Sequence, residues 1–168
     1  QQYTCFYLLK ELISKNNELK SIIETGINNN TINFLPEEIW KKIRSQNFIP
    51  PMEGIIDFED FFKKGYNIGT CGWTSRQLSY SFDNVDIVSG ILPILKGTKN
   101  AEKEGGHIWL ENDKYIIDTT LMLIIDKSIK EKIGYIEEQR ITSTDLLTNG
   151  RYQERKYFTN DRTIKGRH

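Results

Sequence analysis

Apolar residues recur at helical spacing in the first part of this 168-residue chain. From Cys5 to Glu24 they are separated by Lys, Glu and Asn, which is the pattern of an amphipathic helix packed on a core. The stretch predicts one such helix or two, with Cys5 as a small buried hydrophobe. The Asn-rich segment from Gly26 to Thr31 then predicts a loop.

Two further helices are expected before the middle of the chain. Pro36 opens one that continues through Arg44, because proline suits the first helical turn and the acids that follow it complement the helix dipole. The acidic and aromatic stretch from Ile55 to Lys64 predicts the other. Segment 1–64 is therefore expected to be a helical N-terminal part.

Strand patterns dominate the centre of the sequence. Val85–Leu95 is an apolar run that predicts a strand, with Gly90 as a bulge and Pro93 at an edge or a strand end. Leu121–Ile125 predicts a buried strand. The chain is thus expected to have an α+β fold.

A hairpin is predicted between these two strands. Gly106–Glu111 and Lys114–Asp118 are rich in Ile, Trp and Tyr, and Asn112-Asp113 is a plausible two-residue loop. That loop pairs His107 directly with Asp118, on one face of the sheet.

Composition adds few constraints. The chain has 23 basic and 23 acidic residues, so its net charge of +0 indicates neither a nucleic acid nor an anionic membrane as partner. The tail from Arg151 is locally basic and aromatic, a pattern compatible with contact to nucleic acid or a protein partner, but a strand with solvated charges accounts for it better. No apolar run reaches the roughly 20 residues of a membrane span. The length favours a single domain, 1–168.

The two cysteines and two histidines limit the possible chemistry. Two cysteines are too few for a disulfide framework, and with one interior histidine they build no zinc site, so neither a metal nor another cofactor is expected. The first residue is Gln1 rather than Met, which leaves the compartment open. The oligomeric state is open as well.

Cys71 is the candidate nucleophile. It follows a glycine-rich segment, Gly65–Gly72, and stands where helical character resumes. Backbone N–H groups at a helix start stabilise a thiolate and can bind an oxyanion. Ser75 and Ser79 are interpreted as ordinary residues of the helix surface. A buried cysteine in a glycine-rich turn is the alternative.

His107 and Asp118 favour the nucleophile over the buried structural cysteine as the interpretation of Cys71. A histidine that faces an aspartate is a candidate base with its orienting carboxylate. The pairing would also satisfy a carboxylate in an apolar run. The alternative is an Asp118 that caps the strand through Thr119 or Thr120. Trp109, two residues after His107, either walls the site or belongs to the core.

These residues resemble a known family. Gly69-Thr70-Cys71, Gly106-His107-Ile108-Trp109 and Asp118-Thr119-Thr120 are similar to the core of the transglutaminase-like cysteine enzymes, a branch of the papain-like fold that includes transglutaminases, proteases, peptide N-glycanases and deamidases. The resemblance covers Tyr66–Ile125. It implies a catalytic triad of Cys71, His107 and Asp118.

The expected function is thiol-dependent acyl chemistry on an amide or peptide bond, with a protein or peptide as substrate. Water would resolve the acyl-enzyme in a protease or deamidase, and an amine would do so in a transglutaminase. The alternatives are acyl transfer of the arylamine N-acetyltransferase type and a non-catalytic protein-binding module. The expected division is a catalytic core at 65–126 and a C-terminal part at 127–168. The residues expected to contact substrate are Gly69, Gly72, Trp73 and Trp109.

Overall fold

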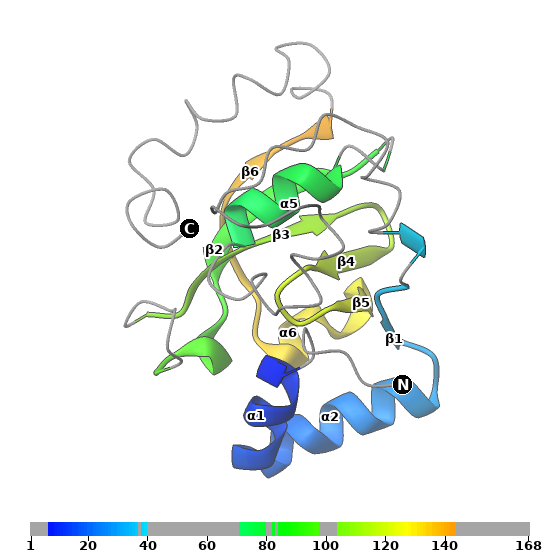
Figure 1. Ribbon diagram of the computed structural model, residues 1–168, viewed down its shortest axis with the longest axis vertical. Coiled ribbons are helices and arrows are strands. Elements are labelled where there is room, and N and C mark those ends of the chain that lie inside the picture. The colour runs from blue at the N-terminus through cyan, green and yellow to red at the C-terminus, as the bar shows by residue number, and fades with distance from the viewer. Residues whose placement is uncertain are drawn as a thin grey trace, which may run out of the picture.

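The computed structural model describes residues 7–36, 38–39, 71–79, 82, 84–97 and 104–143. Within these residues, four α-helices accompany a six-stranded antiparallel sheet, so the fold is mixed α+β, as predicted. Figure 1 shows helix α5 over the sheet, with helices α1 and α2 at the lower end of the view. Most of the helix expected at 36–44, the one at 55–64, Cys5 and the tail from Arg151 lie outside the described residues.

Helices α1 (Tyr7–Lys15) and α2 (Asn17–Asn28) form the beginning of the described chain, so the amphipathic stretch folds as two helices. Asn16 separates them. Its side-chain oxygen accepts a hydrogen bond from the N–H of Leu19 at 3.0 Å, which satisfies a donor that the first turn of α2 would otherwise leave open. The cap explains why α2 begins where it does.

The loop predicted from Gly26 is wrong at its start, because α2 continues to Asn28. Gly26 is buried, and a Cβ at this position would lie 2.5 Å from Cδ1 of Ile32. The glycine therefore allows the helix to approach the following strand closely, and it does not mark a turn.

Six strands form the sheet, in the order β1-β5-β4-β3-β2-β6. Every neighbouring pair is antiparallel. The strands are β1 (Ile32–Phe34), β2 (Asp86–Ile91), β3 (Gly106–Glu111), β4 (Tyr115–Asp118), β5 (Leu123–Asp126) and β6 (Ile136–Ile141).

The outer strands β1 and β6 correct the expected division of the chain. β1 belongs to the segment expected to be helical, yet it pairs with β5. β6 belongs to the expected C-terminal part, yet it pairs with β2. One sheet thus takes strands from 1–64, 65–126 and 127–168. A 3₁₀ turn, η4 (Lys127–Ile129), and helix α6 (Lys130–Ile133) lead into β6.

Strand β2 is shorter than predicted, because it ends at Ile91 and Pro93–Leu95 forms the 3₁₀ turn η3. Proline has no N–H to donate to a neighbouring strand, which explains the early end. The bulge predicted at Gly90 is confirmed: the pairing of β2 with β6 changes register between Ser89 and Gly90.

An apolar core joins helices α1 and α2 to the sheet. Helix α5 (Cys71–Ser79) packs against β3 and β2, with Leu78 fully buried. Burial of this kind supplies most of the free energy that favours folding. The core cluster includes Leu8, Leu12, Leu19, Ile23, Val88, Trp109, Ile116, Leu123, Ile125 and Tyr135.

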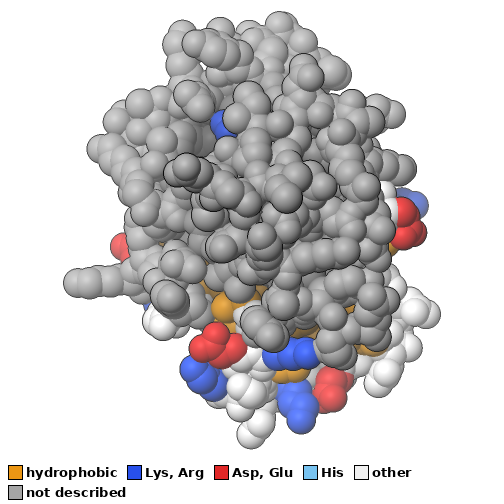
Figure 2. Space-filling model, viewed as in Figure 1, with side chains coloured by type: hydrophobic (Ala, Val, Ile, Leu, Met, Phe, Trp, Pro, Cys, Tyr) orange, Lys and Arg blue, Asp and Glu red, His pale blue; other side chains and the backbone are white. Residues whose placement is uncertain are grey.

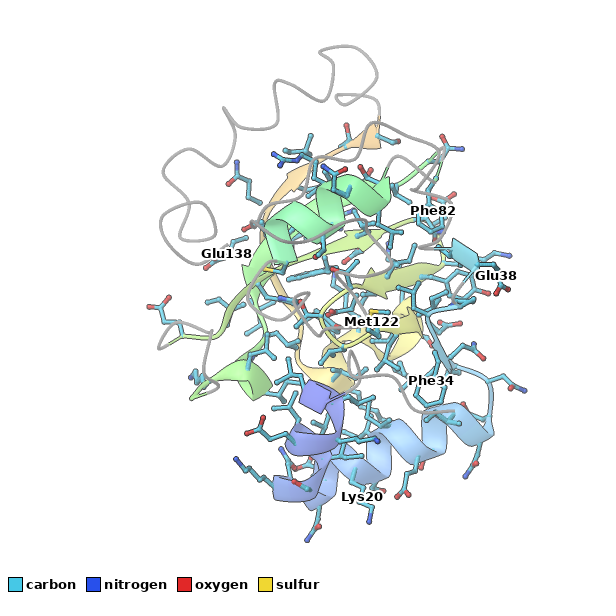
Figure 3. All side chains as sticks on the ribbon, viewed as in Figure 1. Lys20, Phe34, Glu38, Phe82, Met122 and Glu138 are labelled. Atoms are coloured by element: carbon cyan, nitrogen blue, oxygen red, sulfur yellow. The ribbon has the colours of Figure 1, made fainter. Side chains whose placement is uncertain are left out.

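Charged side chains of both signs lie around α1 and α2. Figure 2 shows them interspersed at the lower end of this face, as the balanced composition leads one to expect. In Figure 3, Lys20 projects from α2 while Met122 lies inside the fold. Of the helices that the structure describes, none has the length and apolar character to cross a membrane.

Candidate active site

Cys71 is the first residue of helix α5. It is 1% exposed, and its Sγ accepts a hydrogen bond from the backbone N–H of Ile108 at 3.3 Å. An N–H donor stabilises a thiolate more than a thiol. The position at a helix start acts in the same direction. Both features favour ionised sulfur.

Buried hydroxyl groups hold α5 against the sheet. Ser75 Oγ donates to the carbonyl oxygen of Ile108 at 3.4 Å, and the hydroxyls of Thr74 and Thr119 lie 2.6 Å apart. Ile108 therefore directs its N–H and its C=O to α5. The prediction that Ser75 and Ser79 lie on the helix surface is wrong, since each is 0% exposed. A hydroxyl that finds a backbone acceptor can be buried.

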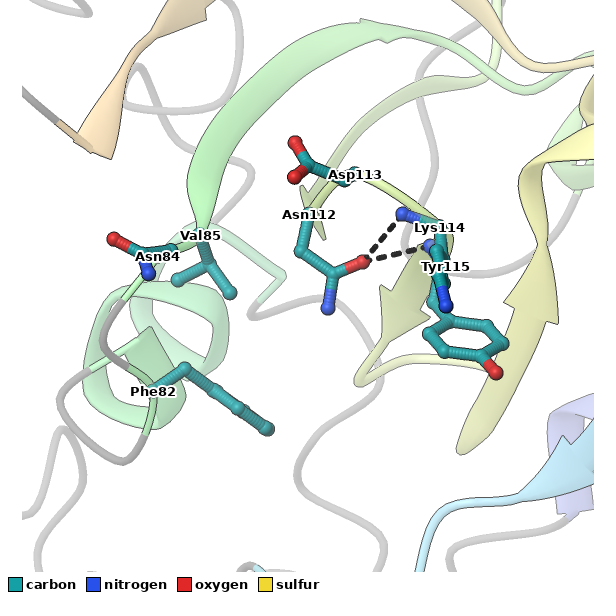
Figure 4. Close-up of a pocket in the computed structure, with 7 residues that line it drawn as sticks. All are labelled: Phe82, Asn84, Val85, Asn112, Asp113, Lys114 and Tyr115. Carbon is teal, nitrogen blue, oxygen red and sulfur yellow. Dashed lines mark hydrogen bonds between the residues drawn. The ribbon is translucent and has the colours of Figure 1, made fainter.

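The turn between β3 and β4 lies one residue later than predicted. The N–H of Asn112 donates to the carbonyl oxygen of Tyr115 at 3.0 Å. Asn112 Oδ1 accepts hydrogen bonds from the N–H groups of Lys114 and Tyr115 at 2.9 and 2.7 Å (Figure 4). Asn favours the first position of a turn for this reason. The two central residues are consequently Asp113 and Lys114.

Moving the turn by one residue shifts the strand register by two. Glu111 pairs with Ile116, so the direct opposition of His107 and Asp118 is wrong. The continued register places Asp118 opposite Trp109. Because side chains alternate between faces, a shift of two leaves His107 and Asp118 on the same face as diagonal neighbours.

His107 and Asp118 are in contact despite the shifted register. His107 Nε2 lies 2.8 Å from Asp118 Oδ2. The two residues are 1% and 0% exposed. Since Nε2 is committed to the carboxylate, Nδ1 is the ring nitrogen left for Cys71, whose side chain also acts on the imidazole by hydrogen bond and charge.

Asp118 accepts hydrogen bonds on both of its oxygens. Oδ2 accepts from His107 and from the hydroxyl of Tyr135, at 2.8 and 2.7 Å. Oδ1 accepts from the N–H groups of Thr120 and Leu121, each at 2.9 Å. Asp118 therefore pairs with His107 through Oδ2 and also caps the end of the strand through Oδ1, so both of the expected roles are found. Such a set of donors lets a carboxylate be buried.

The segment after Asp118 is a tight turn. Met122 has a φ of 59°, a left-handed conformation that residues other than glycine seldom adopt, and it is 0% exposed. Its carbonyl oxygen accepts a hydrogen bond from the N–H of Leu35 at 2.8 Å. The strand predicted from Leu121 consequently begins at Leu123.

The contact between His107 and Asp118 is an ion pair. Burial by itself lowers the pKa of His107, but the charge and hydrogen bond of Asp118, together with Cys71, outweigh burial and raise it to about 10. Burial raises the pKa of Asp118, whereas the His107 charge and the hydrogen bonds to the carboxylate bring it below its ordinary value. Imidazolium and carboxylate thus coexist at neutral pH.

Trp109 belongs to the core, which is one of the two roles considered for it, and it also contacts the site. The side chain is 0% exposed. Its ring stacks on that of His107, with centroids 5.9 Å apart and an interplanar angle of 30°. Its Nε1 donates to Glu111 Oε2 at 2.7 Å. Trp109 therefore supports the imidazole from the core side.

Glu111 is a neighbour of the site that sequence reasoning missed. It is 0% exposed and accepts from Lys130 at 2.6 Å and from Arg140 at 2.8 Å. Burial raises the pKa of Glu111, but Lys130, Trp109 and Arg140 outweigh burial and lower it to about 2. One sequence signal could have found it: Glu111 alternates with His107 and Trp109 along the strand, and therefore lies on the same face.

Tyr135 was also missed. Its position in sequence, well beyond the hairpin, gives no spacing that links it to Asp118. Burial raises its pKa well above the ordinary value, and the charge of Asp118 raises it further, so the hydroxyl remains a neutral donor. A buried tyrosine generally finds a partner for its O–H.

The remaining expected substrate contacts are described in part. Gly72 is half-buried in α5, the side chain of Trp73 is not among the described features, and Gly69 lies outside the described residues.

A pocket of about 390 Å³ is lined by Phe82, Asn84, Val85 and the turn at 112–115 (Figure 4), and Cys71 is not part of its lining. Among the described residues, no group of three or more His, Cys, Asp or Glu side chains is placed to hold a metal ion.

No protein-family model, curated protein or solved structure matches this chain. The similarity to transglutaminase-like cysteine enzymes accordingly rests on the sequence motifs alone. Function is inferred from the geometry of the site.

Proposed function

We propose that this chain is a cysteine enzyme with a papain-like, transglutaminase-like core that performs acyl chemistry on amide bonds. Cys71 is the nucleophile, His107 the acid–base group and Asp118 the residue that orients the imidazole. The main support is the buried hydrogen bond of 2.8 Å between His107 Nε2 and Asp118 Oδ2, next to a cysteine at a helix start.

The proton transfers of the reaction follow from the charges of Cys71 and His107. With His107 as imidazolium, the thiol proton already resides on the ring, and Cys71 attacks as a thiolate. The Sγ–C bond forms, and the C–N bond breaks as His107 gives its proton to the leaving amine. The product is a thioester on Cys71 with neutral His107. His107 then takes a proton from water or from an amine, which attacks the thioester and releases the acyl group.

N–H groups from two elements of the site, α5 and β3, can stabilise the oxyanion of the intermediate. Those in the first turn of α5 are not used within the helix. The N–H of Ile108 contacts the sulfur. Preorganised donors of this kind contribute strongly to acyl transfer.

Substrate must open a path to the thiol, because Cys71 and His107 are each 1% exposed. A closed site keeps water from the thioester, which favours transfer to an amine over hydrolysis. We therefore include crosslinking in the proposed range of reactions, beside the two hydrolytic reactions, deamidation and proteolysis.

Acyl-enzyme trapping tests this function. The protein is mixed with a panel of activated esters and peptide amides, and the adduct is located by mass spectrometry. We expect acylation of Cys71, no adduct in Cys71→Ala, and a rate about 10⁴-fold lower in Asp118→Asn, because the imidazole then loses its orienting anion. Asp113→Asn, an exposed change in the turn, should match the wild type.

Added amine separates the possible reactions. Faster loss of the acyl group with amine indicates crosslinking, and no effect of amine indicates hydrolysis. If Cys71 stays unmodified across the panel, or if Cys5 is acylated in its place, the proposal fails and a non-catalytic binding module replaces it.

A further inference from the structure

Tyr135 shares an acceptor with His107. The Tyr135 hydroxyl donates to Asp118 Oδ2 at 2.7 Å, and His107 Nε2 is bonded to the same oxygen at 2.8 Å. The other oxygen is taken by the backbone N–H groups of Thr120 and Leu121. Tyr135 and His107 therefore both interact with the negative charge on Oδ2 of Asp118.

The fold fixes this hydroxyl in place. Helix α6 ends at Ile133 and is followed by Gly134, whose φ of 108° turns the chain toward the sheet. Tyr135, the next residue, is 4% exposed. Its ring lies 4.9 Å from that of Trp109, with an interplanar angle of 60°. Since Trp109 also stacks on His107, the tyrosine and the imidazole are held against one indole.

We propose that Tyr135 is a positioning residue of the site, which orients the Asp118 carboxylate and sets how strongly Asp118 holds the His107 imidazolium. This inference rests on the proposed function of Cys71. A donor on Oδ2 withdraws negative charge that would otherwise act on Nε2–H. Tyr135 thereby keeps the imidazolium acidic enough to protonate a leaving amine.

Tyr135→Phe isolates the hydroxyl, because phenylalanine keeps the ring packing on Trp109. The first readout is the proton resonance of His107 Nε2–H at neutral pH. His107 and His168 are the two histidines of the chain, so His168→Gln leaves a single imidazole to observe. In Tyr135→Phe the resonance should move downfield, because the hydrogen bond to Asp118 strengthens. Tyr115→Phe, which alters a partly exposed tyrosine of β4, should leave it unchanged.

The second readout compares leaving groups. An amine must be protonated as it leaves, whereas an activated ester releases a stable anion. In Tyr135→Phe the ratio of amide to ester acylation should fall, by up to about tenfold for each pKa unit that the imidazolium gains. A loss of fold would lower both rates together and would appear in the circular dichroism spectrum.

These readouts separate the two proposals. An Nε2–H resonance that stays in place or moves upfield in a folded Tyr135→Phe variant overturns the role of Tyr135, whatever the wild type does. An amide-to-ester ratio equal to that of the wild type also overturns it. A downfield shift together with a wild type that never acylates supports the coupling through Asp118 and refutes the proposed function alone.

Discussion

At the scale of single residues, two fully buried carboxylates shape the region around Cys71. Asp118 and Glu111 are each 0% exposed, and each is satisfied in a different way. Asp118 accepts one cationic imidazolium and three neutral donors. Glu111 accepts the indole N–H of Trp109 and the cations of Lys130 and Arg140. Removal of Asp118 leaves a buried imidazolium without its carboxylate. Removal of Glu111 leaves Lys130 with Glu137, and Arg140 with Glu137 and Asp86, as the remaining acidic partners.

Glu111→Gln should lower the free energy of unfolding at neutral pH by about 1.5–3 kcal/mol, the usual contribution of a hydrogen bond to a charged group. The pKa of Glu111 is lowered from 4.5 to about 2 in the folded chain. Its stabilising contribution is therefore complete above pH 4.5 and is lost as the pH falls toward about 2. Urea unfolding of both proteins should show their difference shrinking across that window.

The control for this prediction is Glu131→Gln, which changes an exposed glutamate on α6. It should unfold like the wild type at every pH. A gap between wild type and Glu111→Gln that stays constant from neutral pH to about pH 2 would contradict the account of Glu111.

At the scale of elements, β2 and β3 hold the imidazole in place from the side opposite Asp118. Gly90 is paired directly with His107. A Cβ at Gly90 would lie 2.0 Å from the carbonyl oxygen of Ile136 and 3.0 Å from the ring of Trp109. The glycine thus lets β6 and the indole of Trp109 come close to β2, the strand that pairs with the one carrying His107.

Gly90→Ala should destabilise the protein by about 1–3 kcal/mol or more and slow acylation of Cys71, because Trp109 and β6 must move. Urea unfolding and acyl-enzyme trapping measure the two effects. Gly97→Ala places a Cβ with no atom within 4 Å, at a φ of 78°. It should cost about 1–2 kcal/mol for its backbone conformation and leave acylation unchanged. Equal acylation in wild type and Gly90→Ala would refute this role of Gly90.

The hairpin shows what a sequence can predict at this scale. The alternation of side chains placed His107 and Asp118 on one face of the sheet, and this prediction is confirmed although the turn was misplaced by one residue. The predicted pairing of His107 with Asp118 was wrong, because both Asn112-Asp113 and Asp113-Lys114 are acceptable loop centres. The side-chain oxygen of Asn112 closes the turn around the second of them. Local sequence alone does not distinguish these two loops.

At the scale of the whole molecule, the mixed α+β class and the helix that begins at Cys71 were predictable. The strand order was not, because β1 has three residues and β6 is mostly polar, IEEQRI, which resembles a solvated surface segment. Their pairing partners β5 and β2 are set by the fold as a whole. Tyr135 reaches the site through the same long-range arrangement, which no spacing in the sequence encodes. Glu111, in contrast, lies on β3 itself, on the face that carries His107 and Trp109.

The most direct test of the account is the pH titration of the Cys71 thiolate. In a Cys5→Ser background, the thiolate is followed by its ultraviolet absorbance, and the spectrum of Cys71→Ala is subtracted to remove tyrosine ionisation. The wild type should hold a thiolate well below the free-thiol pKa of about 8.5, because the His107 imidazolium stabilises it. His107→Ala should return the titration to the ordinary range. If the wild type and His107→Ala titrate alike, Cys71 and His107 do not form a catalytic pair.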